Sequence, residues 1–286
     1  MKGIVWLASY PKSGNTWLRI FLTNLERDGG TRASINDLAF ASGSSARAHF
    51  DEAVGYKAAD LTFDEIDRLR PDVYVYESGV REEAFYSKVH DAFVRLPDGR
   101  PLFPPQVSLR AVYLVRNPLD VCVSFAHHLG ITDLDAMIAS MADPTYAFGG
   151  CAYHWDRQLR QRLRTWSGHV LSWVDGFPKP VHVMRYEDMK RSPAETFTAC
   201  AEFLSLPHDP ERIGRALEGS AFEGLRRQER EGGFREARAG QSFFREGRVG
   251  SWRDALTPEQ AARIVRDHRE VMRRFGYLTD DDQPVF

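Results

Sequence analysis

Short apolar runs alternate with longer stretches of helical periodicity along this chain. The short runs are rich in β-branched or aromatic residues, which is typical of strands buried on both faces. In the longer stretches apolar residues recur every three or four positions, which predicts amphipathic helices. We expect strands at Ile4–Ala8, Val73–Tyr76, Ala111–Val115 and Val181–Met184, and helices at Thr16–Leu25, Leu119–His128, Gln158–Val174, Ala194–Leu204 and Pro258–Phe275.

This alternation predicts an α/β fold in which helices flank a central parallel β-sheet on both faces. We expect one domain over residues 1–286, because no repeat or low-complexity linker divides the chain. Ligands of such sheets bind beyond the carboxyl ends of the strands. Candidate chemistry is therefore sought where each predicted strand ends.

The first predicted strand runs directly into the loop Ser9-Tyr-Pro-Lys-Ser-Gly-Asn-Thr-Trp17. Pro11 ends the strand, Gly14 permits a tight turn, and a helix begins within the loop. A helix N-terminus supplies backbone N–H groups and a positive dipole end for an anion, and Lys12 and Thr16 add a charge and a hydroxyl. The loop predicts a phosphate site. It departs from the Walker A pattern, in which Lys follows the second Gly.

A second motif, Tyr113-Leu-Val-Arg-Asn-Pro-Leu-Asp-Val-Cys-Val-Ser124, follows another predicted strand. Pro118 occupies a favoured position at a helix start. The planar guanidinium of Arg116 suits a phosphate, and the Ser124 hydroxyl can add a donor. This motif predicts a second anionic site.

Together these motifs resemble those of the sulfotransferases that use 3′-phosphoadenosine 5′-phosphosulfate (PAPS). The resemblance implies a P-loop-like, nucleotide-kinase-like fold, PAPS as co-substrate and 3′-phosphoadenosine 5′-phosphate (PAP) as product. No metal is expected, because a sulfuryl group carries less charge than a phosphoryl group and the sequence has no obvious metal cluster. The resemblance also implies transfer of a sulfuryl group to a hydroxyl of a small-molecule acceptor, for which a natural product is one candidate. The contacts that it implies for the phosphosulfate are Lys12, Ser13, Gly14, Asn15, Thr16 and Trp17, and those for the 3′-phosphate are Arg116 and Ser124.

The segment Phe243-Phe-Arg-Glu-Gly-Arg-Val-Gly-Ser-Trp252 resembles the C-terminal Arg/Lys-Gly motif of that family. Arg245 and Gly247 match the motif, whereas Glu246 stands where the family usually has Lys. The aromatic residues of this segment are expected to be packing anchors. For adenine, the resemblance implies contacts from Trp17, Tyr186, Ser220 and Phe222, each of which has core packing as its alternative.

A catalytic base is expected at His90, in a segment that resembles the Lys-Thr-His strand of the family with Val89 in place of Thr. Histidine can accept a hydroxyl proton near neutral pH. Lys88 shares a face with His90 in an extended segment, and we expect it to contact the sulfuryl oxygens. Lys12 is expected to neutralise charge on the leaving oxygen. Glu77 is the alternative base, on the predicted strand Val73–Tyr76 or just beyond it, if burial raises its pKa.

Composition limits the partners. The chain has 286 residues and a formal net charge of −2, which predicts no general attraction to nucleic acid or an anionic membrane. Three widely spaced cysteines and the absence of a signal-peptide pattern favour a cytoplasmic location. Residues 29–60 are expected to form an irregular acceptor-side insertion, and residues 226–248 a mobile loop. Neither the acceptor nor the oligomeric state can be inferred from the sequence.

Two other function classes stay open at this point. A phosphate-loop kinase using ATP and Mg²⁺ would also need a loop like that around Lys12, although the lysine lies at an unusual position. A non-catalytic nucleotide-binding protein would need the same phosphate contacts but neither Lys12 nor His90 for catalysis.

Overall fold

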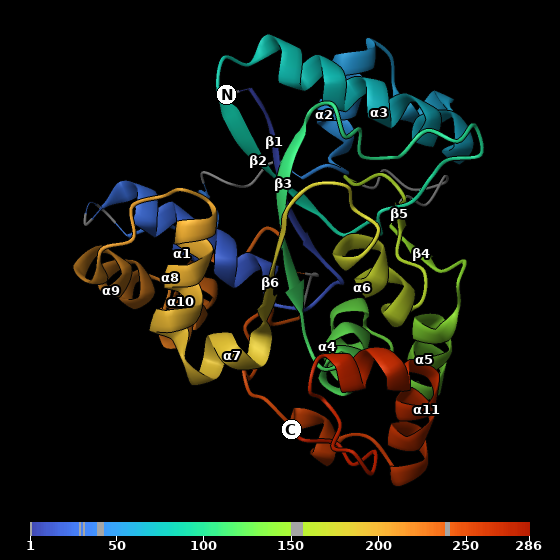
Figure 1. Ribbon diagram of the computed structural model, residues 1–286, viewed down its shortest axis with the longest axis vertical. Helices are drawn as coiled ribbons and strands as arrows, with labels where there is room; N and C mark the ends of the chain where they lie inside the picture. Colours follow the sequence, from blue (N-terminus) through green and yellow to red (C-terminus); the bar gives the residue numbers. More distant parts are fainter. Residues whose placement is uncertain (1, 29, 31, 39–42, 150–156, 238–240) are drawn as a thin grey trace. The chain divides into compact units, whose positions relative to one another are not determined.

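The computed structural model describes residues 2–28, 30, 32–38, 43–149, 157–237 and 241–286. Its central sheet has the strand order β2-β1-β3-β6, shown in Figure 1. The bounds are β1 Gly3–Ser9, β2 Ala84–Val89, β3 Ser108–Val115 and β6 Val181–Arg185. Strand β1 is fully buried and pairs in parallel with β2, with Leu7 opposite Lys88. A second, two-stranded antiparallel sheet joins β4 (Ala147–Phe148) to β5 (Gln161–Arg162).

The chain divides into two compact units, which are described separately below. The first unit comprises Met1–Tyr10, Ser42–Tyr113 and Asp143–Val183, and the second comprises Pro11–Ala41, Leu114–Ala142 and Met184–Phe286. The helices of the first unit are α2 (Arg47–Val54), η1 (Ala58–Asp60), α3 (Phe63–Val80) and α6 (Trp166–Val174). Those of the second are α1 (Asn15–Arg27), α4 (Pro118–Leu129), α5 (Leu134–Ala142), α7 (Tyr186–Arg191), α8 (Pro193–Phe203), α9 (Pro210–Gly219), α10 (Phe222–Gly232), η2 (Ser251–Asp254) and α11 (Pro258–Arg274).

The core of the first unit is aromatic. Phe103 packs edge-on against Trp6, with ring centroids 4.8 Å apart, and lies 5.3 Å from Trp173. Beside these rings lies a buried ion pair, in which Arg70 donates to both carboxylate oxygens of Asp91 at 3.1 and 2.7 Å. Because both groups are almost fully buried, removal of either would leave an uncompensated charge in the core.

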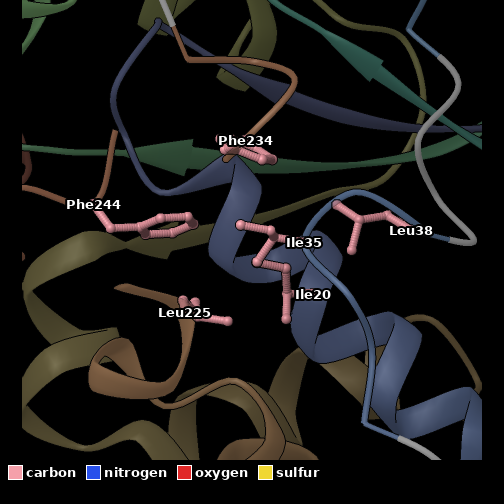
Figure 2. Packing of buried hydrophobic residues seen from close by; sticks show 6 residues of the cluster. All are labelled: Ile20, Ile35, Leu38, Leu225, Phe234 and Phe244. Atoms are coloured by element: carbon pink, nitrogen blue, oxygen red, sulfur yellow. The ribbon is translucent and has the colours of Figure 1, made fainter. Parts of the chain in front are cut away.

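The core of the second unit contains a cluster that joins α1 to the segment after α10. Figure 2 shows its side chains, which are Ile20, Ile35, Leu38, Leu225, Phe234 and Phe244. Arg19 of α1 also donates to Glu236 at 2.8 and 2.5 Å. Burial of apolar area together with this ion pair fixes part of the segment between α10 and η2 against α1.

Most of the elements predicted from the apolar pattern are confirmed. Strands β1, β3 and β6 and helices α1, α4, α8 and α11 contain the expected residues, with bounds that differ by a few positions. The expected α/β class with a central parallel sheet is likewise confirmed.

The predicted strand Val73–Tyr76 is wrong, because these residues lie in α3. Thr62 begins this helix with a capping box, in which its side chain accepts from the Glu65 backbone and the Glu65 side chain accepts in return. Val73 and Tyr74 are both buried, whereas Val75 and Tyr76 are both exposed, so that burial does not alternate from residue to residue as it would in a strand. The run of alternating Val and Tyr therefore did not indicate a strand.

Three further expectations need correction. The predicted helix Gln158–Val174 is helical only from Trp166, because Gln161–Arg162 form β5 and the Thr165 side chain caps α6 by accepting from Gly168. Residues 29–60 are not irregular throughout, since they include α2 and η1; residues 29, 31 and 39–42 lie outside the described part. Residues 226–248 are not one loop, because α10 extends to Gly232.

Candidate active site

The loop between β1 and α1 has the geometry of an anion site. Lys12 and Gly14 both adopt positive φ, 67° and 103°, which turns the chain sharply into the helix. A Cβ at Gly14 would lie 3.0 Å from the Tyr186 ring, so that glycine is favoured there on both counts. The first N–H groups of a helix lack intrahelical acceptors. Ser13 is fully buried, and its Oγ has no hydrogen-bond partner among the described residues, which suits a ligand oxygen.

Of the other loop residues proposed as contacts, Asn15 and Thr16 are the first residues of helix α1 and are buried, one position from the helix start expected at Thr16. Gly14 is the N-cap residue of this helix and has no side chain to cap it. The loop residues 12–17 thus come together at one helix N-terminus.

Arg116 follows β3 directly and lies in the same unit as the loop. Its Nη1 donates to the Lys12 carbonyl at 3.1 Å, and its Nη2 donates to the Arg248 carbonyl at 3.2 Å. The guanidinium is stacked 4.3 Å from the centre of the Tyr186 ring. Its Nε is buried without a hydrogen-bond partner among the described residues. One arginine therefore joins the first loop to the C-terminal segment and keeps a donor for a ligand.

Ser124 lies half-buried on α4, which begins at Pro118 after the N-cap Asn117. The sequence predicted both the helix start and the place of Ser124 within it. The structure shows Ser124 on the helix that begins next to Arg116, as a shared anion site would require.

Asp120 fixes the C-terminal segment to α4, and sequence reasoning missed it. This fully buried carboxylate accepts from the Gly250 N–H at 2.8 Å, from the Ser251 hydroxyl at 3.0 Å and from the Trp252 N–H at 3.0 Å. Its Oδ2 also lies 3.8 Å from Arg116 Nη2. The spacing of four residues from Arg116 on a helix start was the one signal in the sequence.

The Arg245-Glu-Gly247 motif lies within this segment. Gly247 has a φ of 59°, and a Cβ there would lie 2.6 Å from the Phe222 ring. This contact brings the predicted 3′-phosphate motif against a predicted adenine residue. Glu246, the departure from the family pattern, lies 3.5 Å from Arg245 Nε and 3.8 Å from Arg248 Nε. Both of its cationic neighbours are partly exposed.

The residues proposed to bind adenine form an aromatic group in the second unit. The rings of Trp17 and Tyr186 are 6.2 Å apart in an edge-on arrangement. Lys190 Nζ lies 5.7 Å from the Trp17 ring and 5.8 Å from the Phe222 ring. Burial, and to a lesser extent the positive charge of Arg116, lower the pKa of Lys190.

Two further details concern these adenine candidates. Ser220 is buried, and its Oγ donates to the Ala216 carbonyl of α9 at 2.9 Å, which leaves the hydroxyl only its acceptor capacity. The Trp17 Nε1 is buried and has no hydrogen-bond partner within the described ranges. An aromatic face and a donor are thus available together at Trp17.

The ammonium of Lys12 lies over the Phe243 ring, 3.6 Å from its centre. The His128 ring lies 5.9 Å from this ring and perpendicular to it. The sequence predicted packing roles for Phe243 and Phe244, which the cluster around Phe244 confirms. It did not predict the cation–π contact to Lys12.

His90 lies in the first unit, directly after β2. Its Nδ1 is 2.8 Å from the Ser9 carbonyl and 3.2 Å from the Ser9 Oγ. A carbonyl only accepts, so Nδ1 carries the proton and the neutral ring has its lone pair on Nε2. This is the tautomer that a general base needs in order to act through Nε2. Lys88 is half-buried on β2, two positions earlier on the same face.

Glu77, the alternative base, lies on α3 and not on or beside a strand. Burial raises its pKa, while the charges of His49 and Arg81 lower it. The raised pKa that the alternative required is present. Glu77 thus stays a second candidate for the base.

Within the described ranges, no group of three or more His, Cys, Asp or Glu side chains could hold a metal ion. Nor does any helix in this part of the chain have the length and apolar character needed to cross a membrane.

Comparison with known proteins shows extended similarity. The family described as "Sulfotransferase domain" matches residues 2–276. The flavonol 3-sulfotransferase of Flaveria bidentis is 26% identical over 91% of this chain and 78% of the relative. Cytosolic sulfotransferase 5 of Arabidopsis thaliana is 26% identical over 94% of this chain and 80% of the relative.

Two solved structures have the same fold. Retinol dehydratase in complex with androsterone and inactive cofactor PAP gives a TM-score of 0.62 at 18% identity, covering 94% of this chain and 80% of that protein. Mouse sulfotransferase SULT7A1 complexed with PAP gives 0.61 at 19% identity, with 96% and 84% covered. The likeness establishes the architecture expected from the sequence.

Proposed function

Because the chain belongs to the sulfotransferase domain family, we propose that it transfers a sulfuryl group from PAPS to a hydroxyl of a small-molecule acceptor. The products are PAP and a sulfate ester. We further propose that residues 1–286 act as one catalytic domain. The name "cytosolic" given to several relatives supports a cytoplasmic location.

The observation that carries this proposal is the hydrogen bond from Arg116 to the Lys12 carbonyl, 3.1 Å long. It ties the Arg116 guanidinium, at the end of β3, to the backbone of Lys12, whose side chain supplies a second positive charge beside the α1 N-terminus. A nucleotide with phosphate at both its 3′ and 5′ positions needs two such groups, whereas ATP carries all its phosphates on one position. Ser13 Oγ and Arg116 Nε, which have no hydrogen-bond partner in the described part of the chain, supply donors to the two anionic groups.

The aromatic group around Trp17 supports recognition of the base. Its faces suit stacking of a planar ring, and Phe222 lies directly against Gly247 of the phosphate motif. We propose that Tyr186 and Phe222 also contact the adenine base, and that the Ser220 hydroxyl accepts a hydrogen bond from it.

The chemistry follows from the groups present. His90 Nε2 takes the proton of the acceptor hydroxyl, the hydroxyl oxygen forms a bond to sulfur, and the bond from sulfur to the phosphate oxygen breaks. Lys12 neutralises the charge that develops on that leaving oxygen, and Lys88 contacts the sulfuryl oxygens. A sulfuryl group carries less charge than a phosphoryl group, so that protein cations suffice. The proton ends on His90 and the electron pair on PAP.

The solved relatives support a small apolar acceptor. Retinol dehydratase is described in complexes with androsterone and with retinol, each a small molecule that bears a hydroxyl. Another relative is named a flavonol 3-sulfotransferase. We propose an alcohol or phenol of similar size for this chain.

Calorimetry with PAP and with Mg·ATP tests the nucleotide, and transfer of labelled sulfate from PAPS to a panel of phenols and steroid alcohols tests the reaction. We expect PAP to bind and ATP to bind far more weakly. Arg116→Lys retains the charge but loses the planar fork and should weaken PAP binding, whereas the surface change Arg263→Lys serves as its control. Tight binding of ATP alone would contradict the proposal.

A further inference from the structure

A closed set of hydrogen bonds surrounds the peptide group between Ser9 and Tyr10, within the first unit. His90 Nδ1 lies 2.8 Å from the Ser9 carbonyl. The His90 carbonyl is 2.9 Å from Nε2 of His169, and Nδ1 of His169 is 2.8 Å from the Tyr113 hydroxyl. The Tyr113 oxygen in turn interacts with the backbone of Tyr10. Both ends of the set meet at a single peptide, at the start of the loop that follows β1.

The direction of each bond can be assigned from the groups themselves. The His90 carbonyl only accepts, so Nε2 of His169 is the donor. The neutral ring of His169 then has its lone pair on Nδ1, which accepts the Tyr113 O–H. The Tyr10 N–H donates to the Tyr113 oxygen, since this bond lowers the pKa of the phenol. One direction thus runs from Tyr10 through Tyr113 and His169 to His90.

His169 is suited to this part because it stays neutral. It is fully buried, and burial lowers the pKa of its ring to about 4. The groups that face it among the described residues are the Tyr10 ring at 5.3 Å, Tyr113, the His90 carbonyl and the positive charge of Arg164. Of these, only the carbonyl bond favours a charged ring. A protonated Nδ1 could no longer accept the Tyr113 hydroxyl.

We propose that His169, through Tyr113, is a positioning residue that fixes His90 so that the lone pair of its ring is on Nε2. His169 holds the backbone of His90, while the Ser9 carbonyl holds its ring. The Ser9–Tyr10 peptide group takes part in both constraints, because its carbonyl bonds to the His90 ring and its N–H bonds to Tyr113. Loss of the bond from Tyr113 to His169 therefore also weakens the hold on the His90 ring. This inference rests on the proposed role of His90 as the base, and it assigns no contact between His169 and any substrate.

Nuclear magnetic resonance of ¹⁵N-labelled histidine side chains tests the geometry without catalysis. In the wild-type protein, His90 should show Nδ1–H and His169 should show Nε2–H at neutral pH. In His169→Phe, or in Tyr113→Phe if the first variant does not fold, His90 should lose its single tautomer. His268→Phe is the matched control, because His268 is also buried with a pKa lowered to about 4 but lies in the other unit. An unchanged His90 tautomer in a folded Tyr113→Phe protein would overturn the inference.

Kinetics then separate positioning from general stability. We expect Tyr113→Phe to reduce kcat about 10- to 100-fold, since small misplacement of a catalytic group has effects of that size. PAP affinity should stay within about twofold, because the phosphate contacts of the second unit are unaltered. An equal loss in His268→Phe would assign the effect to stability and refute the inference. If the wild-type protein transferred no sulfate, the proposed function would fail, whereas the tautomer measurement would still decide the positioning.

Discussion

Replacement of Asp120 by Asn should release the C-terminal segment from α4. The carboxylate accepts three hydrogen bonds, from Gly250, Ser251 and Trp252, and is fully buried. An asparagine offers one oxygen, and its NH₂ group must face at least one of these donors. A buried backbone N–H is then left without an acceptor.

The magnitude follows from these contacts. A hydrogen bond to a charged group contributes about 1.5–3 kcal/mol, and an unsatisfied buried donor costs about 1–3 kcal/mol. We therefore expect the substitution to destabilise the closed form of the segment, relative to the released form, by at least about 2 kcal/mol. If the segment must be closed to bind the 3′-phosphate, PAP affinity should fall by up to about 30-fold, since each 1.4 kcal/mol is a factor of ten.

Titration calorimetry with PAP measures this loss, and amide hydrogen exchange over residues 245–252 reports release of the segment. Asp254→Asn is the control, because Asp254 belongs to the same region but forms an exposed ion pair with Arg248. Its effect should stay below about 1 kcal/mol. Ser251→Ala, which removes one of the hydrogen bonds to Asp120, should give an intermediate effect.

The reasoning would be refuted by a folded Asp120→Asn protein that binds PAP within about twofold of the wild type and has unchanged exchange over residues 245–252. If this variant does not fold, Ser251→Ala carries the test. In that case wild-type affinity and exchange in Ser251→Ala would be the contrary result.

Further predictions concern the base, a glycine and acid stability. His90→Ala should lower turnover by about two to four orders of magnitude with PAP affinity retained, whereas Glu77→Gln should stay near wild type; the reverse result in radiolabel transfer would make the glutamate the base. Gly247→Ala should weaken PAP binding about tenfold or more, because its Cβ would lie 2.6 Å from an aromatic ring, while Gly233→Ala, with a φ of +68° and nothing within 4 Å, should not. Equal affinities of the two variants in calorimetry would count against the role of that contact. Burial lowers the pKa of His268 from 6.5 to about 4. Between these pH values the unfolded chain takes up a proton that the folded protein does not, so the folded state loses stability as the pH falls from 6.5 toward 4. His268→Gln should therefore remove about 3 kcal/mol of this acid destabilisation between pH 6.5 and 4. Urea unfolding at several pH values measures the free energy of unfolding, and the same pH dependence in variant and wild type would contradict the prediction.

The strand ends and helix starts around Lys12 and Arg116 could be predicted, because each depends on neighbouring residues alone. A strand, a turn and a helix start leave a local pattern, and the structure places Lys12, Gly14 and Arg116 as that pattern indicated. The same reasoning failed at Val73–Tyr76, because the apolar alternation there competes with the capping box at Thr62, eleven positions earlier. A short run cannot show which of two periods governs it.

Contacts between distant residues left no such pattern. Asp120 accepts from Gly250, 130 positions along the chain, and Tyr113 reaches His169 across 56 positions. Both contacts depend on the tertiary structure, which brings distant segments together, and so neither pair can be recognised from the sequence. The sequence could therefore name the groups proposed to bind the nucleotide, but not the buried groups that orient them.

The hydrogen bond from Arg116 to the Lys12 carbonyl has a thermodynamic consequence. Two phosphate groups bound at its two ends would be energetically coupled, because the first to bind orders the hydrogen bond that the second then uses. If the proposed function holds, a nucleotide with only one of the two phosphates must supply the whole free-energy cost of ordering this hydrogen bond. PAP should then bind more favourably than the sum of the binding free energies of adenosine and two separate phosphates. Selectivity for PAP therefore depends on both phosphate sites together.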